Sequence, residues 1–164
     1  MKSLFLDTHI ESKKWTCVLL KNLNIASICN AILKHAAFLS PPDSYKASLS
    51  LRANIIFVDD TYNKNLNLTF REKNKPTNVL SFPLHTMESP TVLNIGDIYI
   101  AYEIVLKEAK EQNKTVINHL IHLIIHGILH LLGYDHEKES DACQMESLEI
   151  LILEKLNVQN PYCL

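Results

Sequence analysis

Three histidines in the C-terminal half of the sequence are the residues whose types and spacing most clearly predict chemistry. His126 and His130 are four positions apart, and His136 follows six positions later. On a helix, side chains four positions apart lie on the same face, so both imidazoles can point toward one place. Gly133 can end such a helix in the left-handed conformation, and the chain can then bring His136 to the same place. Three protein ligands with an open fourth position are typical of a catalytic zinc site.

The ligand type also indicates which ion to expect. A four-coordinate site made only of imidazoles favours zinc, with other divalent transition metals as alternatives. We therefore predict one Zn²⁺ per chain, bound by His126, His130 and His136. His119 and His122 lie on the same predicted helix. For these two we favour a structural role, because a stripe along a helix needs no metal to explain it.

Gly127 separates this motif from that of proteases with the same spacing. The pattern H-x3-H-x2-G-x2-H, which begins at His126, also occurs in the metzincin proteases. Those enzymes carry glutamate directly after the first histidine as a general base, and this chain has Gly127 there. Peptide hydrolysis by the usual route therefore lacks its proton acceptor. The sequence predicts a metal site and disfavours ordinary protease chemistry.

Arg71 is a second residue whose type could serve chemistry, although a lone arginine is more often a surface or ion-pair residue. Its guanidinium is planar and permanently charged, so it can hold two phosphate oxygens and stabilise negative charge on them. Lys73 and Lys75 follow on a predicted loop, where a solvated role is slightly favoured. Residues 1–80 contain 11 Lys and Arg against 6 Asp and Glu, and residues 81–164 contain 5 against 12. This division agrees with a basic nucleic-acid face, although acidic solvated helices would explain it equally well.

The elements that must position these residues follow from the spacing of apolar side chains. Alternating or continuous apolar residues predict four strands, over residues 3–8, 47–58, 79–82 and 93–100. Helices are predicted over residues 21–39, 101–113, 116–132 and 138–156. Most predicted strands lie in the first part of the sequence and most predicted helices in the last part. This order predicts an α+β fold, with helices packed on one small mixed β-sheet. The zinc site would lie on a helix of the C-terminal half and on the turn after it.

Several residues mark where these elements begin and end. Pro41-Pro42 would end the first helix. Thr115 is the expected N-cap of the helix that carries the histidines. Residues 59–60 and the Asn-rich stretch 63–69 are predicted to form a loop. Pro76 and Pro83 frame the third strand, which suits a strand at an edge of the sheet or one bounded by irregular chain.

Composition limits the class of protein. The chain has 164 residues, 47% of them apolar, and a formal net charge of −2, so it suits one domain over residues 1–164 and excludes intrinsic disorder. No uncharged apolar run reaches the length of about 18 residues that spans a membrane. The four cysteines are scattered without a C-x-x-C pair, which favours free thiols over a cysteine-rich zinc site. Because the N-terminus does not resemble a signal peptide, we expect a cytoplasmic protein.

Residues 126–136, HGILHLLGYDH, resemble the signature of the YbeY endoribonucleases, a family of bacterial rRNA maturation factors. Residues 70–82 resemble the family's second block and residues 94–98 its third. Met145-Glu146 and residues 149–151 resemble its C-terminal helix. The resemblance therefore does not rest on the histidine motif alone.

The resemblance implies an activity and a set of site residues. His126, His130 and His136 would bind zinc, and Arg71 would be a catalytic residue near the metal. The family is implied to consist of zinc-dependent endoribonucleases that cut single-stranded RNA in 16S rRNA 3′-end maturation and ribosome quality control. The expected partners are the 16S rRNA precursor and the small ribosomal subunit, with no membrane and no DNA.

We hypothesise metal-assisted cleavage of a phosphodiester bond. Zinc would act as a Lewis acid or lower the pKa of a bound water to about 7, and Arg71 would stabilise the charge of the transition state. Water and the 2′-OH both stay open as the nucleophile, and so does the identity of the general base. Asp97 could orient a histidine or cap a turn, and Asp135 is expected to be a turn residue. Two rival functions stay open: a protease, and a zinc-stabilised module that binds RNA without cutting it.

Overall fold

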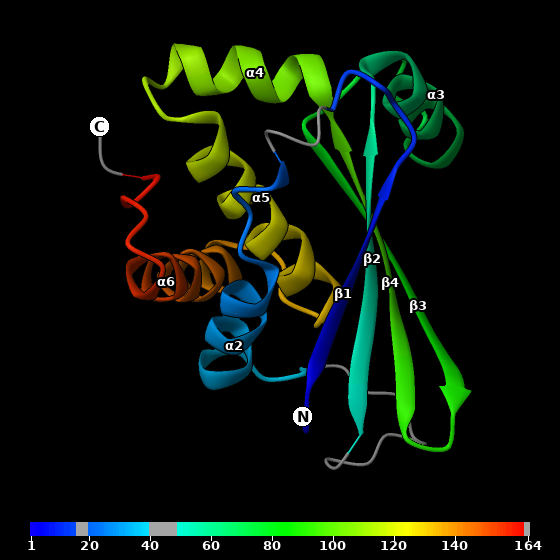
Figure 1. Ribbon diagram of the computed structural model, residues 1–164, viewed down its shortest axis with the longest axis vertical. Coiled ribbons are helices and arrows are strands. Elements are labelled where there is room, and N and C mark those ends of the chain that lie inside the picture. Colours follow the sequence, from blue (N-terminus) through cyan, green and yellow to red (C-terminus); the bar gives the residue numbers. More distant parts are fainter. Residues whose placement is uncertain (16–19, 40–48, 163–164) are drawn as a thin grey trace.

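The computed structural model describes residues 1–15, 20–39 and 49–162. Within these residues the chain forms four strands and five helices (Figure 1): β1 (Leu4–Ile10), α2 (Ile25–His35), β2 (Ser50–Val58), α3 (Asp60–Arg71), β3 (Val79–Ser89), β4 (Val92–Ala101), α4 (Tyr102–Glu111), α5 (Val116–Leu131) and α6 (Glu139–Lys155). The last three helices follow one another without an intervening strand, as the sequence predicts.

The four strands form one mixed sheet in the order β1-β2-β4-β3. β1 and β4 run parallel to β2, whereas β3 runs antiparallel to β4 and lies at an edge. Figure 1 places α2, α5 and α6 on one side of the sheet and α3 beside its other side near one end. The predicted α+β fold with a small mixed sheet is therefore confirmed, and α5 packs against β3 and β4.

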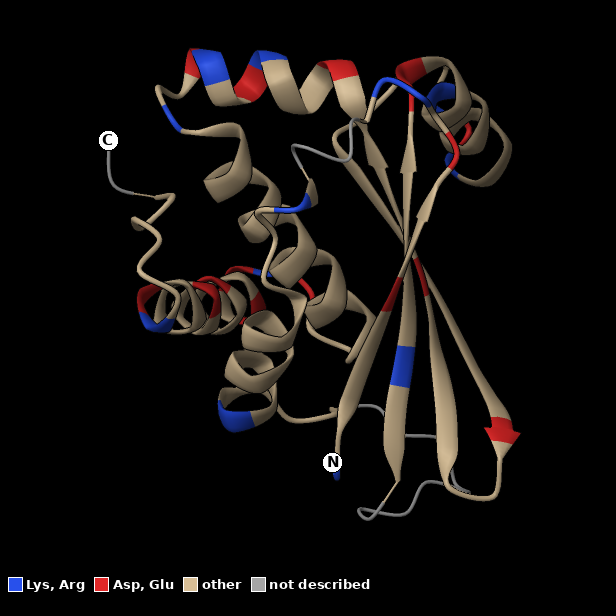
Figure 2. Cartoon of the chain, viewed as in Figure 1, with Lys and Arg blue, Asp and Glu red and all other residues tan. Residues whose placement is uncertain are grey.

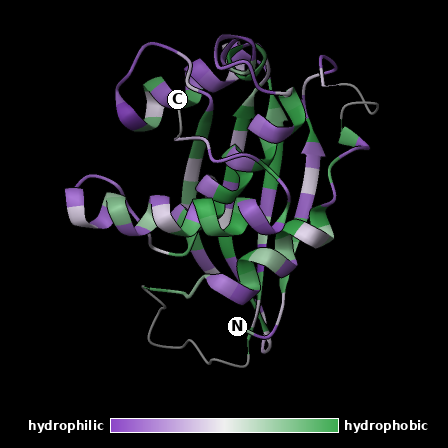
Figure 3. Cartoon of the chain, turned by 90° about the vertical axis from the view of Figure 1, so that its left-hand side faces the viewer, coloured by the Kyte–Doolittle hydropathy of each residue, from purple (hydrophilic) through white to green (hydrophobic). Residues whose placement is uncertain are grey.

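The core lies between the sheet and α5. Ile98 of β4 is fully buried on this side. Tyr99, the next residue, points to the opposite face, where its ring stacks on that of Tyr62 in α3 with 6.1 Å between the ring centroids. Hydrophobic residues are concentrated on the strands behind the helices (Figure 3), and α5 is buried along most of its length. The helix that carries the histidines is thus held by extensive apolar packing.

The prediction of a loop over residues 59–60 and 63–69 is wrong, because this stretch forms α3. Asp59 caps the helix, with its carboxylate accepting a hydrogen bond of 2.9 Å from the backbone N–H of Tyr62. Asparagine has a low intrinsic helix propensity. However, Asn63 and Asn67 are buried and hydrogen-bond to the loop that follows the helix. Hydrogen bonds to the loop that follows therefore stabilise this helix, and helix propensity does not predict them.

The other predicted elements are confirmed, with shifted ends. α2 ends at His35, and Pro41-Pro42 lie outside the described residues. β3 continues past Pro83 to Ser89. An edge strand tolerates this proline, because its register shifts between Pro83 and Thr86 and one side of the strand has no neighbouring strand among the described residues.

Acidic residues are frequent on α6, and both signs alternate along α4 (Figure 2). Arg71 is the basic residue in the last turn of α3. In the described parts of the chain, no helix has the length and apolar character needed to cross a membrane.

Candidate metal centre

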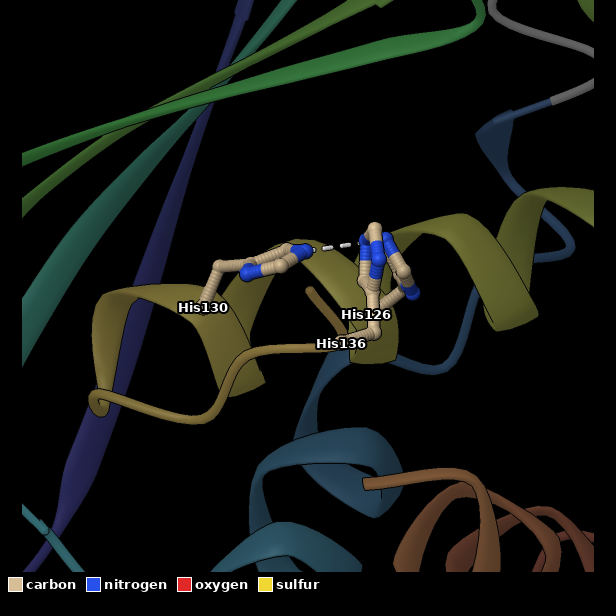
Figure 4. A group of neighbouring side chains, drawn as sticks. All are labelled: His126, His130 and His136. Carbon is tan, nitrogen blue, oxygen red and sulfur yellow. Dashed lines mark hydrogen bonds between the residues drawn. The ribbon is translucent and has the colours of Figure 1, made fainter. Parts of the chain in front are cut away.

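Two of the three predicted ligands lie on the last turns of α5. Thr115 begins this helix as its N-cap, with its hydroxyl accepting a hydrogen bond of 3.1 Å from the backbone N–H of Asn118. His126 and His130 project from the same face, and their Nε2 atoms are 3.1 Å apart (Figure 4). The four-residue spacing therefore places both imidazoles together, as the sequence predicts.

The turn after α5 brings the third histidine to the same place. Gly133 has a φ of 97° and donates its N–H to the carbonyl of His130, and the N–H of Tyr134 donates to the carbonyl five positions earlier. This pair of bonds is the Schellman motif, which satisfies the last carbonyls of a helix. The ring of His136 then lies 5.4 Å from that of His126 and 5.0 Å from that of His130, measured between centroids.

The Nδ1 atoms of His126 and His130 are both held by acceptors. His126 Nδ1 lies 2.8 Å from a carboxylate oxygen of Glu149, and His130 Nδ1 lies 3.0 Å from the backbone carbonyl of Tyr134. With Nδ1 as the donor in each of these contacts, Nε2 of each ring is the nitrogen that can bind a metal. The two Nε2 atoms are only 3.1 Å apart, so one metal ion could lie within reach of both.

The donor set fits a divalent metal ion. The ligating nitrogens of His126, His130 and His136 all lie within 4.8 Å of one another. The pKa of His130 is lowered to about 4, mainly by burial and further by the nearby rings of His126 and His136. His130 is therefore neutral at pH 7, which is the form that binds a metal. Imidazole nitrogens suit zinc and other divalent transition metals.

The three histidines open onto a cleft of about 560 Å³. Its walls come from the end of α3, the residues before β3, the first half of β3, the end of α5 and the turn after α5. Arg71, the last residue of α3, lines this cleft together with the three histidines. The structure thus brings all four predicted site residues to one cleft.

A smaller cavity continues from this cleft along the loop after α3. Its volume is about 300 Å³, and Lys73 and Lys75 line it. Arg71 and Asn78 line both the cavity and the cleft. The two lysines therefore lie next to the cleft, although they are not among its lining residues.

Comparison with known proteins identifies the family. A profile of the family described as Endoribonuclease YbeY matches residues 9–157. The chain belongs to the YbeY endoribonuclease family. Endoribonuclease YbeY of Acinetobacter baumannii (strain ACICU) is 46% identical over 148 residues, which are 87% of this chain and 88% of the relative. Endoribonuclease YbeY of Allorhizobium ampelinum is 39% identical over 166 residues, covering 99% of this chain and 96% of the relative.

A solved structure has a similar fold. The solution structure of TM1509 from Thermotoga maritima has 27% sequence identity to this chain and a TM-score of 0.55. The likeness covers 98% of this chain and 97% of the other. The fold is therefore similar along nearly the whole length.

Gly127, where this YbeY family member departs from the metzincin pattern, faces the sheet. A Cβ built there would lie 2.9 Å from two side-chain carbons of Ile98 and 3.2 Å from Ser81 Oγ. The Ser81 hydroxyl also donates to the Gly127 carbonyl over 3.3 Å. The position therefore allows α5 to pack closely on β3 and β4. A larger side chain there would meet these strands before it could reach the metal centre.

Glu149 is the site residue that sequence reasoning missed. It is fully buried in α6, although glutamate is rarely buried unless it is paired. Burial by itself would raise the pKa of Glu149, but hydrogen bonds from His122 and His126 lower it to about 2. One signal was available in the sequence. Glu149 lies four residues after Met145 and three before Ile152, within the buried stripe of α6.

Three other residues considered from the sequence have partners of their own. Asp97 accepts a hydrogen bond of 2.8 Å from the side chain of Asn54, on the neighbouring strand β2. Asp135 accepts one of 2.8 Å from the backbone N–H of the next residue, which is the expected turn role. His119 Nε2 lies 2.8 Å from a carboxylate oxygen of Glu108, which agrees with a structural role.

Proposed function

We propose that this chain is a zinc-dependent endoribonuclease that cuts single-stranded RNA. The observation that carries the proposal is the meeting of His126, His130 and His136 with Arg71 on one cleft. Membership in the YbeY family supports the reaction class, because its named relatives are called endoribonucleases. The proposed cofactor is one Zn²⁺ per chain.

The proposed substrate is the 16S rRNA precursor, cut in 3′-end maturation and in ribosome quality control. The small ribosomal subunit is the proposed partner, and the cytoplasm is the proposed location. An open cleft suits a single strand, whose phosphates can turn toward Arg71, better than a duplex, whose backbone must be held across a groove. Neither DNA nor a membrane is part of the proposal.

The residues of the chain have two roles in this proposal. His126, His130 and His136 hold the metal through ring nitrogens, and Arg71 binds the phosphate and stabilises the charge that builds during cleavage. When bound, the metal supplies a Lewis acid for a phosphate oxygen or a water of lowered pKa.

Cleavage of a single-stranded RNA by the purified, zinc-loaded chain tests the proposal. We expect His126→Ala to lose cleavage, because two imidazoles hold the metal weakly. Arg71→Ala should lose about 10²- to 10³-fold in rate, as when one donor to a developing charge is removed. Arg52→Ala is the matched control, because Arg52 lies on β2 and pairs with Asp7 and Glu88. Equal cleavage by all four preparations would indicate a contaminating nuclease and contradict the proposal.

The chemistry of the product ends identifies the nucleophile. A 2′,3′-cyclic phosphate would mean that the 2′-OH attacks, and it would eliminate attack by water. Products without a cyclic phosphate at the earliest times would mean that water attacks.

The rival functions give different results in the same preparations. Casein cleavage that His130→Ala abolishes would revive the protease, although the packing of Gly127 leaves no room there for a glutamate base. RNA binding without cleavage by the zinc-loaded chain would favour a non-catalytic module.

A further inference from the structure

The carboxylate of Glu149 is the meeting point of three proton donors next to the metal centre. Its Oε1 lies 2.8 Å from His126 Nδ1, and its Oε2 lies 2.9 Å from His122 Nε2. The hydroxyl of Tyr162 also donates to Oε2. Glu149 itself has no exposed surface. A buried carboxylate costs free energy unless it is hydrogen-bonded in this way.

We propose that Glu149 is a positioning residue for the metal centre, and that His122 and Tyr162 hold its carboxylate in the orientation that His126 requires. This inference rests on the proposed function, since it concerns the affinity of the same three histidines for zinc. Neither Glu149 nor Tyr162 is one of the predicted ligands.

The two carboxylate oxygens of Glu149 contact different partners, and this arrangement supports the role. Oε1 contacts His126, whereas Oε2 receives both His122 and Tyr162. With Oε2 occupied, the carboxylate cannot rotate without breaking two hydrogen bonds. Oε1 therefore keeps its direction toward Nδ1 of His126, and Nε2 of that ring keeps its lone pair toward His130 and His136. Outer carboxylates commonly orient metal-binding histidines in this way.

Charge gives a second reason for the role. Three neutral imidazoles leave a bound dication with both of its charges. A buried anion one hydrogen bond away compensates part of that charge and makes His126 a more basic ligand.

Tyr162 extends this arrangement to the segment that follows α6. The backbone carbonyl of Pro161 accepts a hydrogen bond of 3.2 Å from the side chain of Lys114, the residue before the N-cap of α5. The Tyr162 ring also lies edge-on to that of His122, with 5.9 Å between centroids. The end of the described chain is therefore attached to α5 and contacts the metal centre through Glu149.

A competing arrangement uses the same atoms. The ligating atoms of His122, His126 and Glu149 also lie within 4.8 Å of one another, so they could themselves hold a metal ion. Three hydrogen bonds already satisfy this carboxylate. We therefore place the metal on His126, His130 and His136 and give Glu149 the outer position.

Zinc affinity of the full chain, measured by competition with a chromophoric chelator, tests the inference without an activity assay. We expect Glu149→Gln to weaken zinc binding by about 10- to 100-fold, the usual cost of losing an outer partner of a metal ligand. Tyr162→Phe should weaken it less, since His122 still holds Oε2. Glu154→Gln, the same change at an exposed position of α6, should leave the affinity unchanged. The absorption spectrum of bound Co²⁺ should keep its shape in Tyr162→Phe, because the ligands are the same.

The possible outcomes separate this inference from the proposed function. If wild-type chain binds no zinc, the proposed function fails and the inference fails with it. If wild-type binds zinc and Glu149→Gln binds it equally well, the inference alone is overturned. Loss of all binding in His122→Ala, with binding retained in His130→Ala and His136→Ala, would also overturn it. If Glu149→Gln does not fold, the zinc affinity of Tyr162→Phe tests the inference instead, and an affinity equal to that of the wild type would overturn it. Tyr162 is 42% exposed, so this change needs no repacking.

Discussion

Gly133 stands between the two parts of the metal centre, with His130 three residues before it and His136 three residues after it. Its φ of 97° lies in the region that glycine adopts without strain. The carbonyl of Tyr134, which holds His130 Nδ1, belongs to the same turn. The conformation of one residue therefore affects the placement of two ligands.

We expect Gly133→Ala to lower the free energy of unfolding by about 1–2 kcal/mol, the cost of a Cβ in the left-handed region. Gly133→Asn should lose less, because asparagine tolerates this region better. Urea unfolding of the metal-free chain measures both changes. An alanine variant as stable as the wild type would show that the turn does not require this conformation.

At the scale of elements, α3 presents one face to the loop that follows it. Asn63, Asn67 and Arg71 are spaced four residues apart and so lie along one side of the helix. Asn63 Oδ1 accepts from the backbone N–H of Thr77 over 2.9 Å, and Asn67 Nδ2 donates to the carbonyl of Lys75 over 2.7 Å. The two asparagines thus hold the loop that lines the cleft next to Arg71.

Asn67→Ala should lower the free energy of unfolding by about 1–3 kcal/mol, because the Lys75 carbonyl loses its donor. It should also slow RNA cleavage, since the loop wall of the cleft is no longer held. Asn65→Ala is the control on the exposed side of α3 and should change stability by less than about 0.5 kcal/mol. Urea unfolding and cleavage rates measure both effects, and equal losses in the two variants would contradict the role of Asn67.

At the scale of the whole molecule, Glu108 joins three elements. Its carboxylate accepts hydrogen bonds from the side chain of Asn78, just before β3, at 3.0 and 3.3 Å. It also lies 2.8 Å from His119 Nε2, so α4 and α5 meet there as well. Burial by itself would raise the pKa of Glu108, but these hydrogen bonds outweigh it and the net pKa lies below the ordinary value of 4.5.

This depressed pKa predicts the direction of a pH dependence. A carboxyl whose pKa is lower in the folded state stabilises the fold above its unfolded pKa, and that stabilisation is lost as the pH falls through the folded pKa. The stability difference between wild type and Glu108→Gln should therefore be constant above about pH 6 and shrink below pH 4.5. Urea midpoints across this range measure it. Glu111→Gln, exposed on the same helix, should show no such shrinkage, and a difference that grows toward acid would contradict the role of Glu108.

The sequence by itself determined the elements and the local geometry of the histidine motif. Apolar periodicity predicted the four strands and all the helices of the described residues except α3, because it reports which face of each segment is buried. Helix spacing and a glycine turn predicted the convergence of His126, His130 and His136, because both depend only on residues a few positions apart. The single domain over residues 1–164 stays a prediction.

Only the tertiary structure decided which distant residues complete the site. α3 is stabilised because Asn63 and Asn67 each make a hydrogen bond to a loop outside the helix. Glu149 reaches His126 because α6 packs on α5, and Arg71 reaches the cleft because α3 ends beside it. Such contacts depend on how the strands order themselves in the sheet and how the helices pack on it. Local periodicity carries no information about that order.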